Sequence, residues 1–134
     1  MGDKGEISTL AQLDAFLDQV GGFHDGVIKE MHWINNDFVS DDLHLMPSQG
    51  STARLLIQRQ FDDPSAVEME LQGIKSIFLD TREFVDDSAA ITEGGLLVLA
   101  IEDSRFIFEQ MTYRFVSEWM GEALRFGPGL TGSP

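Results

Sequence analysis

Three histidines lie close together in the sequence, and they share that stretch with several carboxylates. His24, His32 and His44 fall within 21 positions, and Glu30 lies two residues before His32. Imidazole and carboxylate groups are ligands that zinc and other divalent ions accept in proteins. On one extended strand His24 and His32 would be ~27 Å apart, too far to share an ion. The candidate ligands are therefore Glu30, His32 and His44.

A hairpin could bring those three side chains together. If apolar residues face apolar residues across the hairpin, Trp33 pairs with Leu43, and this register places His32 opposite His44. Glu30 then lies next to His32 on the same face of the strand, because side chains alternate. Two imidazoles and a carboxylate at this position could bind a metal ion and support a small metal-dependent enzyme.

The alternative to a metal site is that the histidines have a structural role, and the spacing of the three histidines in the sequence favours this alternative. The three residues match no zinc motif such as two histidines on one helical turn, and a register slip of one residue would separate them. We therefore expect histidines that are hydrogen-bonded within the fold, and we expect no cofactor. Glu30, His32 and His44 remain the candidate metal ligands.

The second candidate for chemistry is the stretch Phe23-His24-Asp25-Gly26. A carboxylate beside an imidazole can orient it as a general base. Adjacent residues of an extended chain point in opposite directions, however, so we expect no contact between His24 and Asp25. We predict instead a structural joint, in which Asp25 accepts backbone N–H groups, Gly26 permits a bend and Phe23 anchors the chain.

One helix and several strands must position these residues. Thr9 and Gln12 form a capping-box pattern, apolar residues recur at helical spacing from Leu10 to Val20, and Gly21-Gly22 ends the helix. Alternating or continuous apolar segments bounded by turn residues then predict strands. These strands are expected at residues 27–34, 42–46, 54–61, 67–72, 74–79, 96–101 and 105–115. Residues 80–93 are expected to form a polar loop, with room for one short strand.

This order of elements predicts a single α+β domain over residues 1–134. We expect a mostly antiparallel sheet of about six strands, with the N-terminal helix packed on it. A parallel sheet would need crossover helices between the strands, and the pattern offers none. Residues 1–7 and 127–134 are expected to be loosely ordered, as chain ends often are.

The charge of the chain is strongly negative. It has 23 acidic and 9 basic residues, for a formal net charge of −14. This balance argues against nucleic acid as a partner, since phosphates would be repelled. Solubility is the simplest meaning of such a charge, and attraction to a basic protein is the more specific one.

The composition excludes several other classes. The chain has no cysteine, so thiolate catalysis and cysteine-bound metals are not expected. Its longest apolar run, residues 96–101, has the length of a strand, so we expect no membrane segment. The first residues lack the basic and apolar segments of a secretory signal, and a cytoplasmic location is the expectation.

A family resemblance rests on the helix that ends in Gly-Gly, on Phe23-His24-Asp25, and on the strand and Leu43-His44-Leu45 that follow. This pattern, over residues 10–46, resembles small bacterial proteins of the "FHD" type, some of which are grouped with immunity proteins of polymorphic toxin systems. The resemblance implies a non-enzymatic α+β protein that binds and neutralises a toxin. It implies no catalytic residues, and it implies a shared structural signature at Phe23, His24, Asp25 and Ile28.

Three functions remain open at this point. The first is a non-enzymatic, immunity-like module that binds a basic protein partner through its acidic surface. The second is the small metal-dependent enzyme built on Glu30, His32 and His44. The third is a self-associating domain, because edge strands leave room for a homodimer.

Overall fold

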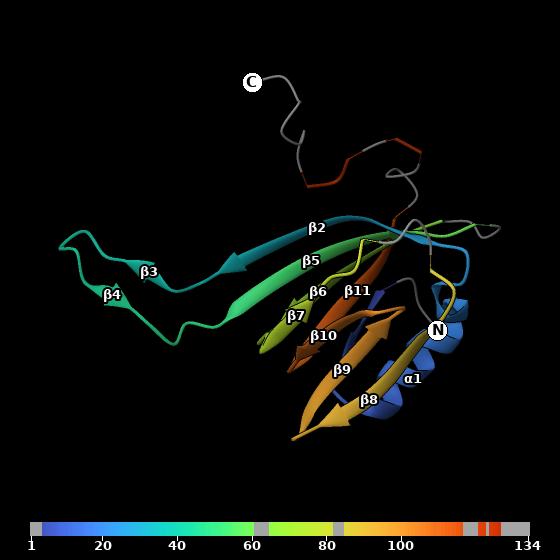
Figure 1. Ribbon diagram of the computed structural model, residues 1–134, viewed down its shortest axis with the longest axis horizontal. Coiled ribbons are helices and arrows are strands. Elements are labelled where there is room, and N and C mark those ends of the chain that lie inside the picture. Colours follow the sequence, from blue (N-terminus) through green and yellow to red (C-terminus); the bar gives the residue numbers. More distant parts are fainter. Residues whose placement is uncertain (1–3, 61–64, 82–84, 117–120, 123, 127–134) are drawn as a thin grey trace.

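Strands make up most of the fold. The computed structural model describes residues 4–60, 65–81, 85–116, 121–122 and 124–126 (Figure 1). The elements are β1 Lys4–Ile7, α1 Leu10–Gln19, the 3₁₀ turn η1 Gly21–Phe23, β2 Val27–Asn35, β3 Phe38–Val39, β4 Leu45–Met46, β5 Ser51–Gln58, β6 Ala66–Gln72, β7 Ser76–Phe78, β8 Ser88–Glu93, β9 Leu96–Ile101, β10 Ser104–Phe108 and β11 Gln110–Val116.

These strands form two packed sheets and a separate ribbon. The larger sheet has the order β1-β11-β6-β5-β2, the smaller sheet has the order β7-β10-β9-β8, and β3 and β4 form a two-stranded sheet. Every pairing described is antiparallel. The predicted α+β class with mostly antiparallel pairing is therefore confirmed, whereas one sheet of about six strands is too simple.

The chain passes from one sheet to the other at a shared corner. The segment predicted as one strand, residues 105–115, is interrupted at Glu109, so that β10 lies in the smaller sheet and β11 in the larger. Beside it, Gly73 separates β6 from β7 with a positive φ of 65°. A Cβ on Gly73 would lie 2.6 Å from the Glu109 carboxyl carbon. The positive φ is the reason that glycine is favoured here, because the exposed Glu109 side chain could move away from an added Cβ.

The helix begins and ends where the sequence predicts. The Thr9 hydroxyl accepts from the Gln12 amide at 3.2 Å, and the Gln12 side chain accepts from the Thr9 amide at 3.2 Å. Gly21 and Gly22 both have positive φ values and end the helix. Of the apolar positions, Leu10 is only half-buried, and the rest of the stripe lies in the core.

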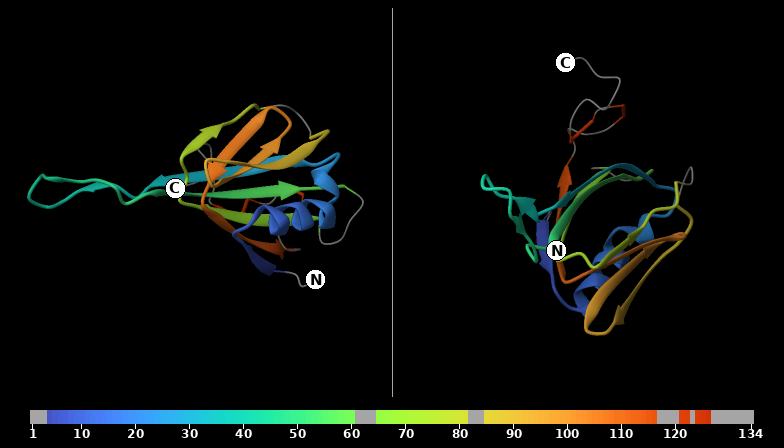
Figure 2. Two further views of the ribbon diagram at one scale, coloured as in Figure 1. Left: turned by 90° about the horizontal axis from the view of Figure 1, so that it is seen from below. Right: turned by 60° about the vertical axis from the view of Figure 1, so that its left-hand side comes forward.

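One apolar core fills the space between the sheets. Figure 2 shows the larger sheet curving over one side, the smaller sheet on the other, and α1 between them at one end. Phe16 of α1 packs on Tyr113 of the larger sheet, with ring centroids 4.5 Å apart, and on Phe23, at 5.8 Å. The largest fully buried side chains of this core are Phe16, Phe23, Phe106, Phe108, Ile7, Leu13, Leu55, Ile57, Met69, Leu71 and Leu99, whereas Leu56 is buried in a separate small cluster with Ala66 and Val116.

The N-terminal segment differs from its prediction. Residues 1–7 were expected to be loosely ordered, but Lys4–Ile7 form β1, which pairs with β11 from Lys4 opposite Arg114 to Ile7 opposite Met111. Ile7 is buried in the core, which explains why this short strand is held at the sheet edge. The other end, 127–134, lies outside the described residues. Over the described residues no helix is long and apolar enough to cross a membrane.

Phe23→Ala should destabilise the protein by about 3–5 kcal/mol, because it empties a fully buried aromatic site between α1 and the sheets. Phe78→Ala is the matched control, since Phe78 is 61% exposed on β7; its effect should stay within about 0.5 kcal/mol. Urea unfolding followed by circular dichroism measures both. Equal effects of the two substitutions would contradict the placement of Phe23 in the core.

Candidate functional site

The Phe23–Gly26 stretch joins α1, β2 and the segment before β8. The Asp25 amide donates to the Val85 carbonyl at 2.8 Å, and the Val85 amide donates to the Gly26 carbonyl at 2.7 Å. A Cβ on Gly26 would lie 2.8 Å from the Gln58 carbonyl oxygen, so only glycine lets the backbones approach this closely. Backbone contacts therefore hold this junction against two other segments, the one at Val85 and the end of β5 at Gln58.

The predicted separation of His24 and Asp25 is wrong. The chain is not extended there, because Asp25 has a positive φ of 63°. Its carboxylate consequently lies 3.5 Å from His24 Nε2. The hydrogen bonds that tie Asp25 to the fold come from its backbone: besides the amide, its carbonyl accepts from Gln60 Nε2 at 3.1 Å. The described contacts do not include the expected acceptance of backbone N–H groups by the Asp25 carboxylate.

His24 has a second acidic neighbour, which sequence reasoning missed. His24 Nδ1 lies 2.8 Å from the Asp86 carbonyl oxygen. This hydrogen bond raises the pKa of His24 above its usual 6.5, and the charges of Asp25, Asp86 and Asp87 raise it further. Asp86 is more than sixty positions from His24 in the sequence. Asp86 and Asp87 together have the composition of an ordinary polar loop. No local pattern could have predicted this neighbour.

The predicted hairpin register is also wrong. β2 pairs with β5, so that His32 faces Arg54 and Trp33 faces Ala53. Residues 36–50 lie between the two strands and extend away from the sheets as a ribbon (Figure 1). The eight residues of β5 offer β2 a longer partner, with a buried face, than the two residues of β4. Burial on one face sets the register, and the 27–46 pattern alone did not contain it.

The structure therefore does not bring Glu30, His32 and His44 together. His32 lies on β2, whereas His44 lies in the turn of the ribbon, where its Nδ1 is 3.1 Å from the Asp42 carboxylate. Glu30 accepts hydrogen bonds from the backbone amides of Arg125 and Phe126. Among the residues that the structure describes, the potential metal ligands that lie together are instead His24, Asp25 and Asp86, with ligand atoms within 4.8 Å of one another.

The ribbon of residues 36–50, here called the arm, carries an unusual amount of exposed apolar surface. Leu43 at its tip is 84% exposed and Phe38 is 53% exposed. Phe38 pairs with Met46, and Val39 pairs with Leu45, so both faces of the arm are apolar. The exposed apolar residues on the arm and the adjoining end of β2 are Trp33, Ile34, Phe38, Val39, Leu43, Leu45 and Met46.

Hydrogen bonds, rather than packing, shape the arm. At its tip the Ser40 amide donates to the His44 carbonyl at 2.8 Å, and the Leu43 amide donates to the Ser40 carbonyl at 2.9 Å. At its base the Gln49 amide donates to the Asp37 carboxylate at 2.8 Å. A two-stranded ribbon of this kind is marginally stable in water without a surface to pack on. The arm is thus pre-shaped but uncovered.

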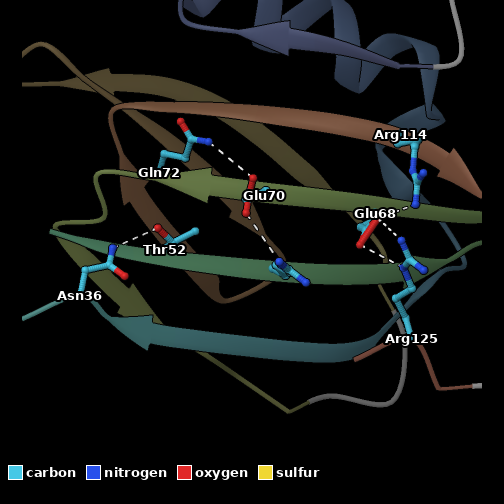
Figure 3. Close-up of polar contacts among 8 residues, drawn as sticks. Asn36, Thr52, Glu68, Glu70, Gln72, Arg114 and Arg125 are labelled. Atoms are coloured by element: carbon cyan, nitrogen blue, oxygen red, sulfur yellow. Dashed lines mark hydrogen bonds and ion pairs between the residues drawn. The ribbon is translucent and has the colours of Figure 1, made fainter. Parts of the chain in front are cut away.

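The outer face of the larger sheet carries a network of ion pairs (Figure 3). Glu68 of β6 accepts from Arg114 at 3.2 Å and from Arg125 Nε at 3.1 Å. Glu70, two residues along, lies 3.7 Å from the Arg54 guanidinium. These residues line a shallow pocket of about 650 Å³ together with Lys4, Glu6 and Thr112. Since acids and bases neutralise one another here, we interpret the network as structural.

Glu68→Gln should cost about 1–3 kcal/mol of stability, because the half-buried carboxylate holds two arginines by charged hydrogen bonds. Glu70→Gln is the control on the same strand and face; its pair is longer and more exposed, so we expect about 0–1 kcal/mol. Chemical denaturation of both variants measures the difference. A larger loss for Glu70→Gln would contradict the assigned network.

His24 should titrate above 6.5 in chelator-treated protein, because its folded environment favours the protonated ring. The stabilisation from this proton is therefore present at low pH and is lost as pH rises through the raised pKa. Asp25→Asn should lower the pKa of His24 relative to wild type, because it removes the charge of Asp25 and keeps the hydrogen bond to the Asp86 carbonyl, the largest cause. NMR titration of the His24 ring protons tests this. An unchanged pKa in the variant would contradict the interaction between His24 and Asp25.

Comparison with known proteins assigns this chain to no family. No family model matches the chain, and no curated protein or solved structure matches it either. The arm, the His24 junction and the outer face of the sheet are therefore interpreted from their own residues.

Proposed function

We propose that this chain is a non-enzymatic binding module that captures a basic protein partner with its arm. The observation that carries the proposal is the apolar surface of residues 36–50, which is exposed on both faces of a protruding ribbon. Large exposed apolar patches on a folded protein mark interaction sites.

The charge of the arm supports a basic partner. Residues 36–50 contain three aspartates, Asp37, Asp41 and Asp42, and no lysine or arginine. They add a local negative charge to a chain whose net charge is already −14. A partner that fits would offer an apolar groove bordered by lysine and arginine, so that the apolar contacts give affinity and the charges speed association.

The same charge weakens the case for a homodimer. Two copies that docked arm to arm would bring acidic residues against acidic residues, and like charges across an interface are unfavourable. A module that neutralises a toxin, as the FHD resemblance implies, would use the arm to cover a functional surface of that toxin. The Phe23–Gly26 junction has no contact with the partner in this proposal and serves the fold.

The arm can be tested with the product of the adjacent gene, expressed and purified as the candidate basic partner. Phe38→Ser/Leu43→Ser should weaken the complex by at least about 30-fold, as expected for two apolar anchors of an interface. Phe78→Ser/Ile91→Ser removes two exposed apolar residues from the smaller sheet and is the matched control; it should bind like wild type. Titration calorimetry at rising salt measures affinity and its charge dependence.

Two results would contradict the proposal. One is a complex that both double variants form equally well, or one whose affinity does not fall with salt. The other is light scattering that shows a wild-type homodimer, made monomeric by Phe38→Ser/Leu43→Ser, because the arm would then serve self-association.

A further inference from the structure

Three potential metal ligands meet at the junction between η1 and β2, away from the arm. One ring nitrogen of His24 and one carboxylate oxygen each from Asp25 and Asp86 lie within 4.8 Å of one another. His24 and Asp25 come from the turn before β2, and Asp86 comes from the segment before β8. The group is accessible, since both His24 and Asp86 are exposed and Asp25 is half-exposed.

The hydrogen bond of His24 decides which nitrogen faces the carboxylates. A backbone carbonyl can only accept, so the 2.8 Å contact with Asp86 places the proton on Nδ1. In the neutral ring Nε2 then carries a lone pair, and this lone pair lies beside the Asp25 carboxylate. Histidines that bind metals are commonly oriented by such a bond from the other ring nitrogen.

The distance between His24 Nε2 and Asp25 Oδ2 suits a shared ion better than a shared proton. It is 3.5 Å, whereas a charged N–H···O bond is normally about 2.7–2.9 Å long. Nitrogen and oxygen ligands at about 2.0–2.1 Å from a tetrahedral zinc ion lie about 3.3 Å apart. If His24 Nε2 and Asp25 Oδ2 moved slightly closer together, both atoms could bind the same zinc ion.

The backbone around the three ligands is fixed. The paired hydrogen bonds between Val85 and residues 25 and 26 hold the two segments together. The Glu102 carboxylate accepts from the amides of Asp86 and Asp87, which positions the turn that carries Asp86. Ligands on such a scaffold lose little freedom when they bind an ion, and this favours affinity.

We propose that His24 Nε2, Asp25 and Asp86 bind one divalent transition-metal ion, with zinc as the best fit, and that water completes its coordination. The imidazole ligand favours zinc and its neighbours in the first transition row over calcium or magnesium, which take oxygen ligands. The arm takes no part in this site, so the inference stands apart from the proposed binding of a protein partner.

The test is calorimetric titration of tag-free, chelator-stripped protein with zinc chloride. Wild type should bind one equivalent, and His24→Ala should lose that binding. Asp86→Asn is the second variant; it keeps the backbone carbonyl that orients His24 and should also weaken binding strongly. Circular dichroism confirms that each variant is folded before its titration is interpreted.

The chain offers a matched control for adventitious binding. His44 and Asp42 form a comparable pair at 3.1 Å on the exposed arm, and the metal-ligand groups of the described residues do not include them. His44→Ala, alone and with His32→Ala, should bind zinc like wild type. Wild type without binding heat would overturn the proposal, as would loss of binding in the His44→Ala variant or wild-type affinity in both His24→Ala and Asp86→Asn.

Discussion

The corner at Gly73 and Glu109 is the constraint on which the rest of the fold depends. Two chain segments cross there between the larger sheet and the smaller, and Gly73 supplies the positive φ that the turn from β6 to β7 requires. The crossing places the two sheets face to face, and one apolar core with Phe16 and Phe23 fills the space between them. Because β5 and β6 are joined in this larger sheet, β2 finds its partner in β5.

The arm is a consequence of that pairing. Once β2 pairs with β5, residues 36–50 have no sheet left to join, and they form a short ribbon of their own. Its side chains are nevertheless those of a buried strand, with Phe38, Leu43 and Leu45 exposed to solvent. A sequence that keeps apolar residues where its own fold cannot bury them indicates a surface supplied by another molecule.

Local patterns predicted the helix and most strands but missed β1 and β3, and they predicted the contacts between elements less well. The helix, its Thr9–Gln12 cap and its glycine end follow from short-range rules, and the α+β class follows from the strand spacing. The predicted pairing of Trp33 with Leu43 was wrong because β4, with two residues, and β5, with eight, compete to pair with β2. The buried face of β5 decides between them. The meeting of His24 with Asp86 joins distant segments through backbone hydrogen bonds, which no side-chain pattern records.

The central claim is that the arm is the surface a partner covers, and hydrogen–deuterium exchange tests it most directly. In the free protein the amides of residues 36–50 should exchange quickly, because the ribbon is held by few hydrogen bonds and little packing. In the complex with its basic partner these amides should become strongly protected while the sheets change little. Protection confined to the outer face of the larger sheet, with an unchanged arm, would contradict the account.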